Sequence, residues 1–366
     1  MSTTSSDLAP VLADVELDPA AVTVLERAYA GTSGLDPVRE AVGRGPVLLE
    51  ISGAPTPETL ATMRDALWPA AHVVAVYRTD GQGGLDRQTL SGTTRLPARL
   101  DGPPRTVLFV HSRADALGRK NTVAKFDANA EGWNGVPGSP TYGHFRWMRK
   151  LLADVAAPMQ GLRVLDAGCG AGWVGIEAAL QGADAAAFDP SPAMVEIAKR
   201  NAAENGVGLD ARVGFVEDVP FDEPFDLVLN SGVISFAPES GVYIERLDAL
   251  LRPGGTLVIG DLNPESRGFS RRRRRPLLPA RELNGLRRDE VEALLTERGY
   301  TVEGRWYYQL TFPIPELMAL SEQRLGGFGC RLALAANQSA TRKDHARGSP
   351  GARRFDSWIL RATKPA

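Results

Sequence analysis

A glycine-rich loop between a strand and a helix constrains the fold of this chain more than any other feature. The run Val164-Leu-Asp-Ala-Gly-Cys-Gly-Ala-Gly-Trp173 predicts a strand that ends at Asp166, three glycines at alternate positions and then a helix. Glycine lets a backbone turn tightly and lets a ligand approach without a Cβ in the way. The sequence therefore predicts a ligand site at the carboxyl end of this strand, where open α/β sheets bind their ligands.

Strand and helix patterns alternate regularly from residue 161 onward. Repeated strand–helix units with short turns favour a parallel sheet that is covered on both faces. We therefore expect an α/β fold with a Rossmann-like, seven-stranded, mostly parallel sheet. The last strand follows another strand without a crossover helix between them, so it is expected to be antiparallel. The expected strands are 162–167, 183–188, 213–216, 225–230, 256–260, 300–308 and 357–361, and the expected helices are 173–180, 192–204, 242–251 and 288–298.

The chain is longer than one typical domain of ~150 residues, and its pattern changes along its length. Residues 1–115 suggest a small N-terminal α/β domain, and residues 116–141, which are rich in turn formers, suggest a linker or lid. Residues 142–366 form the expected ligand-binding domain, with insertions near 262–287 and 309–356 that should cap the ligand edge of the sheet. Within the first domain we expect a helix around 20–30, strands at 47–51, 72–77 and 106–110, and a helix that begins after a Thr56 cap.

An internal similarity connects the two halves. Leu48-Leu-Glu-Ile-Ser-Gly53 resembles Leu227-Val-Leu-Asn-Ser-Gly232, and Asp65-Ala-Leu-Trp-Pro69 resembles Asp248-Ala-Leu-Leu-Arg-Pro253. One interpretation makes the N-terminal domain a degenerate half copy of the C-terminal fold. The other is that any two strand–helix–strand units look alike. In either case the first domain lacks the glycine-rich half and is expected to have a structural role.

Composition excludes several classes of function. The formal net charge of −2 gives no general nucleic-acid-binding character, and two cysteines provide neither a disulfide framework nor metal-ligand spacing. The few cysteines fit a reducing cytosol. The N-terminal residues lack the pattern of a secretory signal, and no apolar run approaches the ~18 residues of a membrane span. We therefore expect a cytoplasmic protein without a metal site.

Two acidic residues accompany the glycine loop. Asp189 is expected to end the next strand, 17 residues after Gly172, where a carboxylate can accept hydrogen bonds from both hydroxyls of a ribose. Asp218, in Val216-Glu-Asp-Val219, is expected to end the third strand and can meet the exocyclic amine of adenine. Together the three strand ends predict a nucleoside site.

These motifs, in this order, resemble the class I S-adenosylmethionine-dependent methyltransferases of the small-molecule type, similar to those of quinone biosynthesis. The resemblance covers residues 161–262 and includes Phe225-Asp-Leu-Val-Leu-Asn230 and Leu251-Arg-Pro-Gly-Gly-Thr-Leu-Val258; Lys125-Phe-Asp127 and Trp133 weakly resemble the N-terminal lid of such enzymes. It implies S-adenosylmethionine as cofactor and a methyltransferase activity. The cofactor-binding residues that it implies are Asp166, Ala167, Gly168, Cys169, Gly170, Gly172, Asp189, Pro190, Asp218, Val219 and Asn230.

Two other interpretations of the glycine loop compete with this one. Gly170-Ala-Gly-Trp-Val-Gly175 fits the G-x-G-x-x-G pattern of a nicotinamide dehydrogenase. In that fingerprint, however, the first glycine directly follows the strand, whereas here Asp166 precedes the glycines. The second interpretation is a fold relic that binds no cofactor, and the acids at all three strand ends argue against it.

The substrate is less constrained than the cofactor. Between Ser266 and Arg288 the chain has nine arginines and one acid, including the run Ser270-Arg-Arg-Arg-Arg-Arg-Pro276. Guanidinium groups suit carboxylates and phosphates, so the substrate could be a small anionic molecule. The alternative is an RNA or an acidic protein bound through the arginine-rich loop, although aromatic residues for base stacking are missing from the run. A charge run that only faces water is the simplest interpretation, and the oligomeric state stays open.

Catalytic demand is modest in this chemistry. Methyl transfer from a sulfonium is an in-line displacement, so holding the two reactants together supplies much of the effect. An oxygen acceptor can also use a general base, and the best placed of four histidines is His144 on the helix before the glycine loop. Cys169 is expected to be a small packing residue and not a nucleophile.

Overall fold

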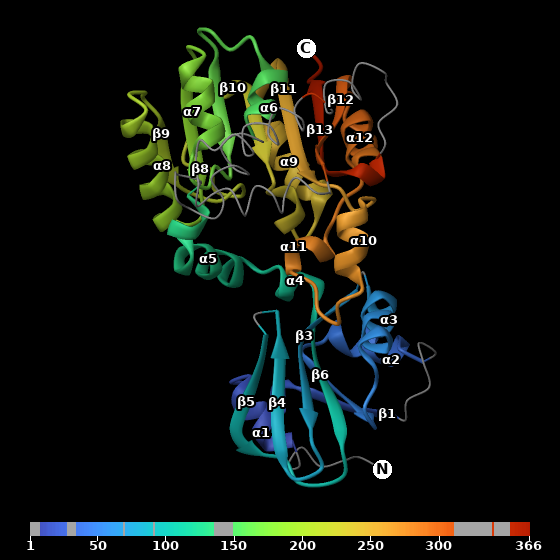
Figure 1. Ribbon diagram of the computed structural model, residues 1–366. Helices are drawn as coiled ribbons and strands as arrows, with labels where there is room; N and C mark the ends of the chain where they lie inside the picture. The colour runs from blue at the N-terminus through green and yellow to red at the C-terminus, as the bar shows by residue number, and fades with distance from the viewer. Residues whose placement is uncertain are drawn as a thin grey trace. The chain divides into compact units, whose positions relative to one another are not determined.

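The computed structural model describes residues 8–27, 34–68, 70–90, 92–134, 149–310, 339 and 352–366. Its contacts divide the chain into two compact units (Figure 1). Unit 1 consists of residues 1–118 together with 271–283, and unit 2 consists of residues 119–270 and 284–366. Within the described ranges, no helix is long and apolar enough to cross a membrane.

Unit 1 contains a mixed sheet with the strand order β1-β2-β6-β3-β4-β5. The pair β1–β2 is parallel and the other neighbouring pairs are antiparallel. Its strands are β1 (Thr23–Arg27), β2 (Val47–Ser52), β3 (Ala71–Thr79), β4 (Gly84–Thr89), β5 (Gly92–Arg99) and β6 (Arg105–Ser112). Its helices are α1 (Ala9–Asp14), η2 (Pro19–Ala21), α2 (Asp36–Val42), α3 (Pro57–Leu67) and α4 (Arg113–Ala116), followed later in the chain by α11 (Ala280–Leu283).

Successive apolar side chains of the central strands of unit 1 point to opposite faces of the sheet. Each face therefore has its own apolar core. Helices α2 and α3 cover one face, where Leu60 and Met63 of α3 pack on Leu49 and Val76. Helix α1 covers the other face through Val11 and its neighbours. The Thr56 side chain accepts a hydrogen bond from the backbone of Thr59 and caps α3 as expected.

Unit 2 contains a seven-stranded sheet with the order β12-β13-β11-β10-β7-β8-β9. The central run from β11 to β9 is parallel, and β13 runs antiparallel to both of its neighbours, as expected for the last strand. The α/β, Rossmann-like class expected from the sequence therefore describes this unit. The strands are β7 (Arg163–Ala167), β8 (Asp184–Asp189), β9 (Asp210–Val213), β10 (Phe225–Ser231), β11 (Leu251–Leu262), β12 (Thr301–Leu310) and β13 (Phe355–Thr363).

Helices lie on both faces of the unit 2 sheet (Figure 1). Apolar residues of α6 and α7 pack on one face with Val164 and Leu227, and α8 packs beside them. Residues of α9 and α12 pack on the other face around Leu257 and Trp358. The helices are α5 (Arg119–Ala128), η3 (Ala130–Trp133), α6 (Arg149–Ala156), α7 (Trp173–Leu180), α8 (Pro192–Glu204), η5 (Ile234–Phe236), α9 (Ser240–Ala249), α12 (Arg288–Glu297) and η7 (Ala352–Arg354), with α10 (Arg267–Arg273) passing into the segment of unit 1.

Three local expectations are corrected. The helix expected around 20–30 is instead the end of η2 followed by strand β1 over its described part. The strand expected at 213–216 is β9, which ends at Val213, so Asp218 lies beyond it. The internal similarity does not extend to topology, because β6 separates β2 from β3 whereas β10 and β11 are direct neighbours.

The arginine-rich insertion near 262–287 is divided between the two units. Residues 271–283 belong to unit 1 and the flanking residues to unit 2, and its role as a cap on the ligand edge stays a prediction. Leu277 of this segment is buried in the apolar cluster of α2 and α3, and Leu278 is buried beside it. The expected insertion at 309–356 falls almost entirely outside the described residues.

Candidate functional site

The glycine loop connects β7 to α7 at the carboxyl edge of the unit 2 sheet. The backbone N–H groups of Gly168 and Cys169 both donate to the Phe188 carbonyl of β8, at 2.9 and 3.0 Å. Gly168 has a φ of 73°, and a Cβ there would lie 2.6 Å from a methyl carbon of Val233. Gly172 has a φ of 83° and would bring a Cβ to 2.8 Å from the Cβ of Ala198. Glycine is therefore required at both positions by backbone conformation and by space.

Asp189 ends β8 directly beside this loop. One carboxylate oxygen accepts a hydrogen bond from the backbone N–H of Gly170 at 2.9 Å, and the other accepts from the backbone N–H of Ser191 at 2.9 Å. The side chain thus joins the glycine loop to the start of α8, and the residue is only partly buried, so a ligand can reach it. The role of Asp189 toward a ribose stays a prediction.

Two buried polar residues hold the glycine loop in shape through hydrogen bonds. Asp166 is 1% exposed and accepts a hydrogen bond from the Gly175 N–H at 2.9 Å, which ties β7 to the first turn of α7. Asn201 of α8 is fully buried and donates to the Ala171 carbonyl at 2.9 Å. The sequence pattern marks Asp166 but not Asn201, because a single polar residue inside a helix carries no signal of its own.

Asn230 lies near the end of β10, next to β7, and is fully buried. Its amide nitrogen donates to the Ala167 carbonyl and to the Tyr243 hydroxyl, both at 2.9 Å. Its amide oxygen has no hydrogen-bond partner in the described part of the chain. Burial raises the pKa of Tyr243, and the carboxylates of Asp261 and Asp189 raise it further, so the hydroxyl is protonated at neutral pH. This edge of the sheet therefore has an acidic character and an unused buried acceptor.

Asp218 and Val219 were expected at the end of a strand, but they follow a tight turn after β9. The Asp218 N–H donates to the Phe215 carbonyl at 3.0 Å, and the Asp218 residue is exposed. The sequence pattern misplaced the end of the strand, since β9 has only four residues and begins with a polar one. A contact of Asp218 with adenine stays a prediction, as do the roles of Pro190 and Val219.

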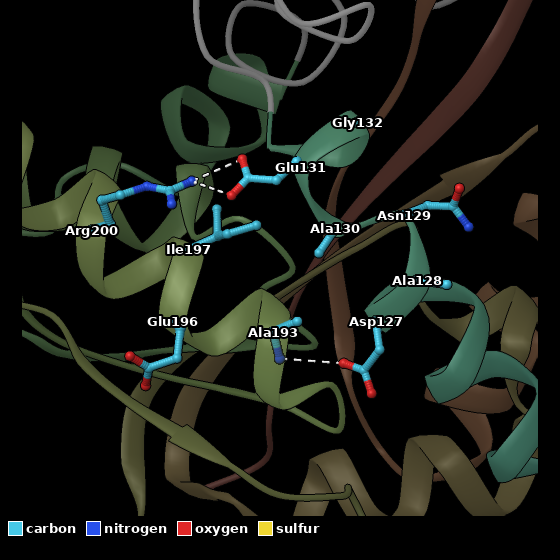
Figure 2. Close-up of a pocket in the computed structure, with 10 residues that line it drawn as sticks. All are labelled: Asp127, Ala128, Asn129, Ala130, Glu131, Gly132, Ala193, Glu196, Ile197 and Arg200. Atoms are coloured by element: carbon cyan, nitrogen blue, oxygen red, sulfur yellow. Dashed lines mark hydrogen bonds and ion pairs between the residues drawn. The ribbon is translucent and has the colours of Figure 1, made fainter.

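The segment 119–134 lies against the start of α8, and its role as a lid stays a prediction. Asp127 accepts hydrogen bonds from the Ser191 hydroxyl and from the Ala193 N–H, the latter at 3.3 Å. The ring of Phe126 contacts that of Phe236, with 5.5 Å between the centroids. Figure 2 shows Asp127 facing Ala193, and Arg200 of α8 paired with Glu131. A shallow cleft of about 470 Å³ lies between this segment and α8.

A buried carboxylate was missed at the end of β11. Asp261 is 2% exposed and accepts hydrogen bonds from both the N–H and the hydroxyl of Ser235, each at 3.0 Å. It thereby holds η5, the turn that follows β10. The same rule that identified Asp189, an acid at the carboxyl end of a parallel strand, could have found it.

The two remaining expectations concern catalysis. His144 lies outside the described residues, so its proposed role as a base is untested. Cys169 is buried among Ala187, Val195 and Ala198, and burial raises the pKa of its thiol well above the usual value. Because a thiol becomes a nucleophile only as the thiolate, Cys169 is a packing residue, as expected.

Comparisons with known proteins identify the family of this chain. Residues 158–292 match a family described as a methyltransferase domain. The ubiquinone biosynthesis O-methyltransferase of Azorhizobium caulinodans is 30% identical over 171 residues, which cover 43% of this chain and 68% of that protein. The enzyme of the same name from Xanthomonas campestris pv. campestris is 38% identical over 122 residues, 33% of this chain and 50% of that protein. The chain thus spans about half to two thirds of the length of these relatives.

The chain is also similar to solved structures. The magnesium protoporphyrin IX methyltransferase of Synechocystis PCC 6803, with bound S-adenosylhomocysteine, aligns with 68% of this chain and 100% of its own length. Its sequence identity is 17% and the TM-score is 0.47. The matched family model covers the part of the chain that contains the glycine loop and Asp189. Residues 1–118 of unit 1 lie outside the matched family model, whereas its segment 271–283 lies within it.

Proposed function

Because this chain belongs to the class I S-adenosylmethionine-dependent methyltransferases, we propose that it transfers a methyl group to a small organic molecule. An oxygen atom is the proposed acceptor, in preference to nitrogen or carbon, since the similar curated proteins are named O-methyltransferases. The observation that carries the proposal is the joining of the glycine loop to Asp189 at the parallel edge of unit 2. The activity, the acceptor and the site residues belong to the proposal.

The residues at this edge fit the cofactor. Asp189 can accept hydrogen bonds from ribose hydroxyls, and an added Cβ at Gly170 would meet nothing closer than 3.5 Å, so the loop leaves space on that side. The buried amide oxygen of Asn230 is an acceptor for a ligand N–H group. The carboxylates of Asp189, Asp166 and Asp261 favour a positively charged ligand at close range. When bound, the cofactor supplies a methyl group on a sulfonium.

The residues of this chain contribute to methyl transfer more by positioning the reactants than by acid–base chemistry. Asp166 and Asn201 hold the glycine loop in one conformation, so the loop is preorganised before the cofactor binds. The segment 119–134 is anchored to the start of α8 through Asp127 and limits access of water. Holding two reactants in line can lower the barrier by about 7–11 kcal/mol. His144 is the proposed general base for an oxygen acceptor.

A second candidate function is the binding of RNA or an acidic protein through the arginine-rich segment. Four arginines of the run 271–275 are exposed, which favours this candidate. Two observations weaken it: Arg273 pairs with Asp65 at 3.2 Å, and the half-buried Arg272 pairs with Glu282 at 2.9 Å. Binding of RNA should weaken steeply as salt rises, whereas turnover of a small molecule should change little.

The test is methyl transfer from radiolabelled S-adenosylmethionine to a panel of phenols, catechols and carboxylated aromatics, followed by a metabolite extract. We expect label in an organic product with at least one acceptor, and its loss in the Asp189→Ala variant. Structured RNA and an acidic protein are included as competing acceptors. Label that enters RNA or protein but no small molecule would overturn the proposal.

A further inference from the structure

Arg288 holds a positive charge over an aromatic ring at the start of α12. The Cζ atom of its guanidinium lies 4.4 Å from the centroid of the Tyr307 ring. Its Nε and Nη1 atoms are buried and have no hydrogen-bond partner among the residues that the structure describes. A buried guanidinium nitrogen without a hydrogen bond is costly. Arg288 therefore presents donors that a ligand can satisfy.

Three carboxylates around Arg288 and Tyr307 each have another partner. The pairs are Asp289 with Arg287 at 2.9 Å, Glu292 with Arg305, and Glu265 with the Tyr307 hydroxyl at 3.4 Å. Within the described ranges, none of the three forms an ion pair with Arg288. The charge of Arg288 is thus left for a ligand. Because the three carboxylates repel a doubly charged anion, a singly charged one suits this position best.

The Tyr307 ring under Arg288 lies level with the ligand edge of the unit 2 sheet. In the sheet register, Tyr307 pairs with Trp358, which in turn pairs with Asp261 at the end of β11. Residues that are paired across strands point to the same face of a sheet. Strand β12 also runs in the direction of β11, because both are antiparallel to β13 between them. Arg288 therefore lies along the edge where β10 and β11 end, on the face that α9 and α12 cover.

Aromatic and aliphatic side chains connect this position with η5, the turn after β10. The Tyr307 ring stacks on Phe355 of β13, with 6.5 Å between the centroids and 19° between the ring planes. Both rings belong to the apolar cluster that includes Ile234 of η5. In the strand order β12-β13-β11-β10, β12 is three strand spacings from β10, which is about 14 Å. A molecule that reaches from the glycine loop to Arg288 is therefore extended and has its anionic group at one end.

We propose that Arg288 is a specificity-determining residue that binds the carboxylate of an aromatic methyl acceptor. The guanidinium donates to the carboxylate oxygens, while the Tyr307 ring holds it in place through a cation–π contact. The methyl-accepting atom lies at the opposite end of the acceptor, toward β10. This inference rests on the proposed function, because it names the class of molecule that receives the methyl group. The binding of a carboxylate by Arg288 can nevertheless be tested without turnover.

The main test is equilibrium dialysis of the full chain, in the presence of S-adenosylhomocysteine, against radiolabelled para-hydroxybenzoate, para-hydroxyphenylacetate and para-coumarate. Each acid is compared with its neutral amide. We expect at least one acid to bind the wild type about tenfold or more tightly than its amide. Arg288→Gln should lose this preference with little change in its affinity for the amide. Thermal melting checks that the variant is folded.

Two further variants separate a specific contact from a general effect of charge. Arg287→Gln removes the neighbouring arginine, which already pairs with Asp289, and should keep the wild-type preference for the acid. Arg288→Lys keeps the charge but lacks the planar fork, so it should restore the preference only in part. An equal loss of preference in Arg287→Gln and Arg288→Gln would overturn the proposal.

The remaining outcomes distinguish the site from the reaction. Failure of every acid to bind the wild type would overturn the proposal, as would tighter binding of phenyl phosphate than of any acid. For an acid that is methylated, Arg288→Gln should raise the KM by about tenfold and change the Kd of S-adenosylmethionine by less than about twofold. Acid binding that depends on Arg288, without methyl transfer to any acceptor, would overturn the proposed function and support the carboxylate site alone.

Discussion

The two sheets of this protein differ in how their strand ends are distributed. Over the described residues, unit 2 has four neighbouring pairs that run parallel, whereas unit 1 has one, β1 with β2. In unit 2 the carboxyl ends of neighbouring strands therefore meet at one edge, where Asp189, Asn230 and Asp261 gather. In unit 1 the end of β2 lies opposite the start of β6, since Ser52 pairs with Arg105. Parallel topology is thus what concentrates loops and carboxylates into a site.

The buried polar residues of the two units follow the same division. In unit 1, Glu50 pairs with Arg105, and Arg64 donates to a backbone carbonyl of the segment 271–283, so both interactions join parts of the same unit. In unit 2, the buried amide oxygen of Asn230 lies at the ligand edge without a partner within the described ranges. We infer that unit 1 is built for support and unit 2 for ligand binding.

The largest effect is expected from adding one methyl group to the glycine loop. Gly172→Ala introduces left-handed strain of roughly 1–2 kcal/mol and a Cβ 2.8 Å from that of Ala198, which adds about 1–3 kcal/mol of overpacking. Gly53→Ala in unit 1, where φ is +92° and nothing lies within 4 Å of an added Cβ, should introduce the strain alone. Urea unfolding followed by tryptophan fluorescence measures both losses. Equal losses would show that the loop is not tightly packed.

The next effect is a pH dependence that belongs to unit 1. Burial, together with the nearby charges of Arg64 and His111, lowers the pKa of His72 from 6.5 to about 4. Between these values the unfolded chain binds the proton and the folded chain does not, so stability falls as the pH drops from 6.5 toward 4. The loss should reach about 3 kcal/mol. Urea titrations at pH 7 and pH 4.5 should show a smaller pH dependence in His72→Gln, and an unchanged one would contradict this account.

The smallest effect is expected at the surface of the lid segment. Glu131 and Arg200 pair at 3.0 Å, but their side chains are 69% and 47% exposed. Exposed pairs are worth about 0–1 kcal/mol, so Glu131→Gln should lower the free energy of unfolding by less than about 1 kcal/mol. The difference should shrink further in 1 M salt. A loss of several kcal/mol would mean that this pair anchors the lid far more strongly than its exposure indicates.

Helices and strands could be predicted from the sequence where the residues that mark their ends are neighbours in the chain. Helices α7 and α8 begin and end at the predicted residues, because strand–turn–helix units carry glycine and proline boundary signals. Strand β9 was misplaced because a short polar strand has little periodicity. The order of strands in unit 1 was not predictable, since β6 pairs with β2 and β3 although β4 and β5 separate it from both along the chain.

Residues 271–283 show a different limit of prediction from sequence. In sequence, a run of five arginines predicts a solvated loop, and Arg64 has the pattern of an ordinary helix-surface residue. The structure buries Arg64 against the carbonyls of residues 273 and 275, which are more than 200 positions away. Backbone carbonyls are identical in every residue type, so no sequence motif marks such a partner. The candidate cofactor residues were easier to find, because their side chains carry the chemistry.

The most direct test of the central claim compares two aspartates at opposite ends of β8. Asp184 begins the strand and is exposed, whereas Asp189 ends it beside the glycine loop. Each hydrogen bond to a charged group is worth roughly 1.5–3 kcal/mol. Calorimetric titration with S-adenosylmethionine should therefore show a loss of affinity of about tenfold to several hundredfold in Asp189→Ala and wild-type affinity in Asp184→Ala, with both variants folded by thermal melting. Equal affinity in the two variants would contradict the claim that the cofactor binds at the parallel edge of unit 2.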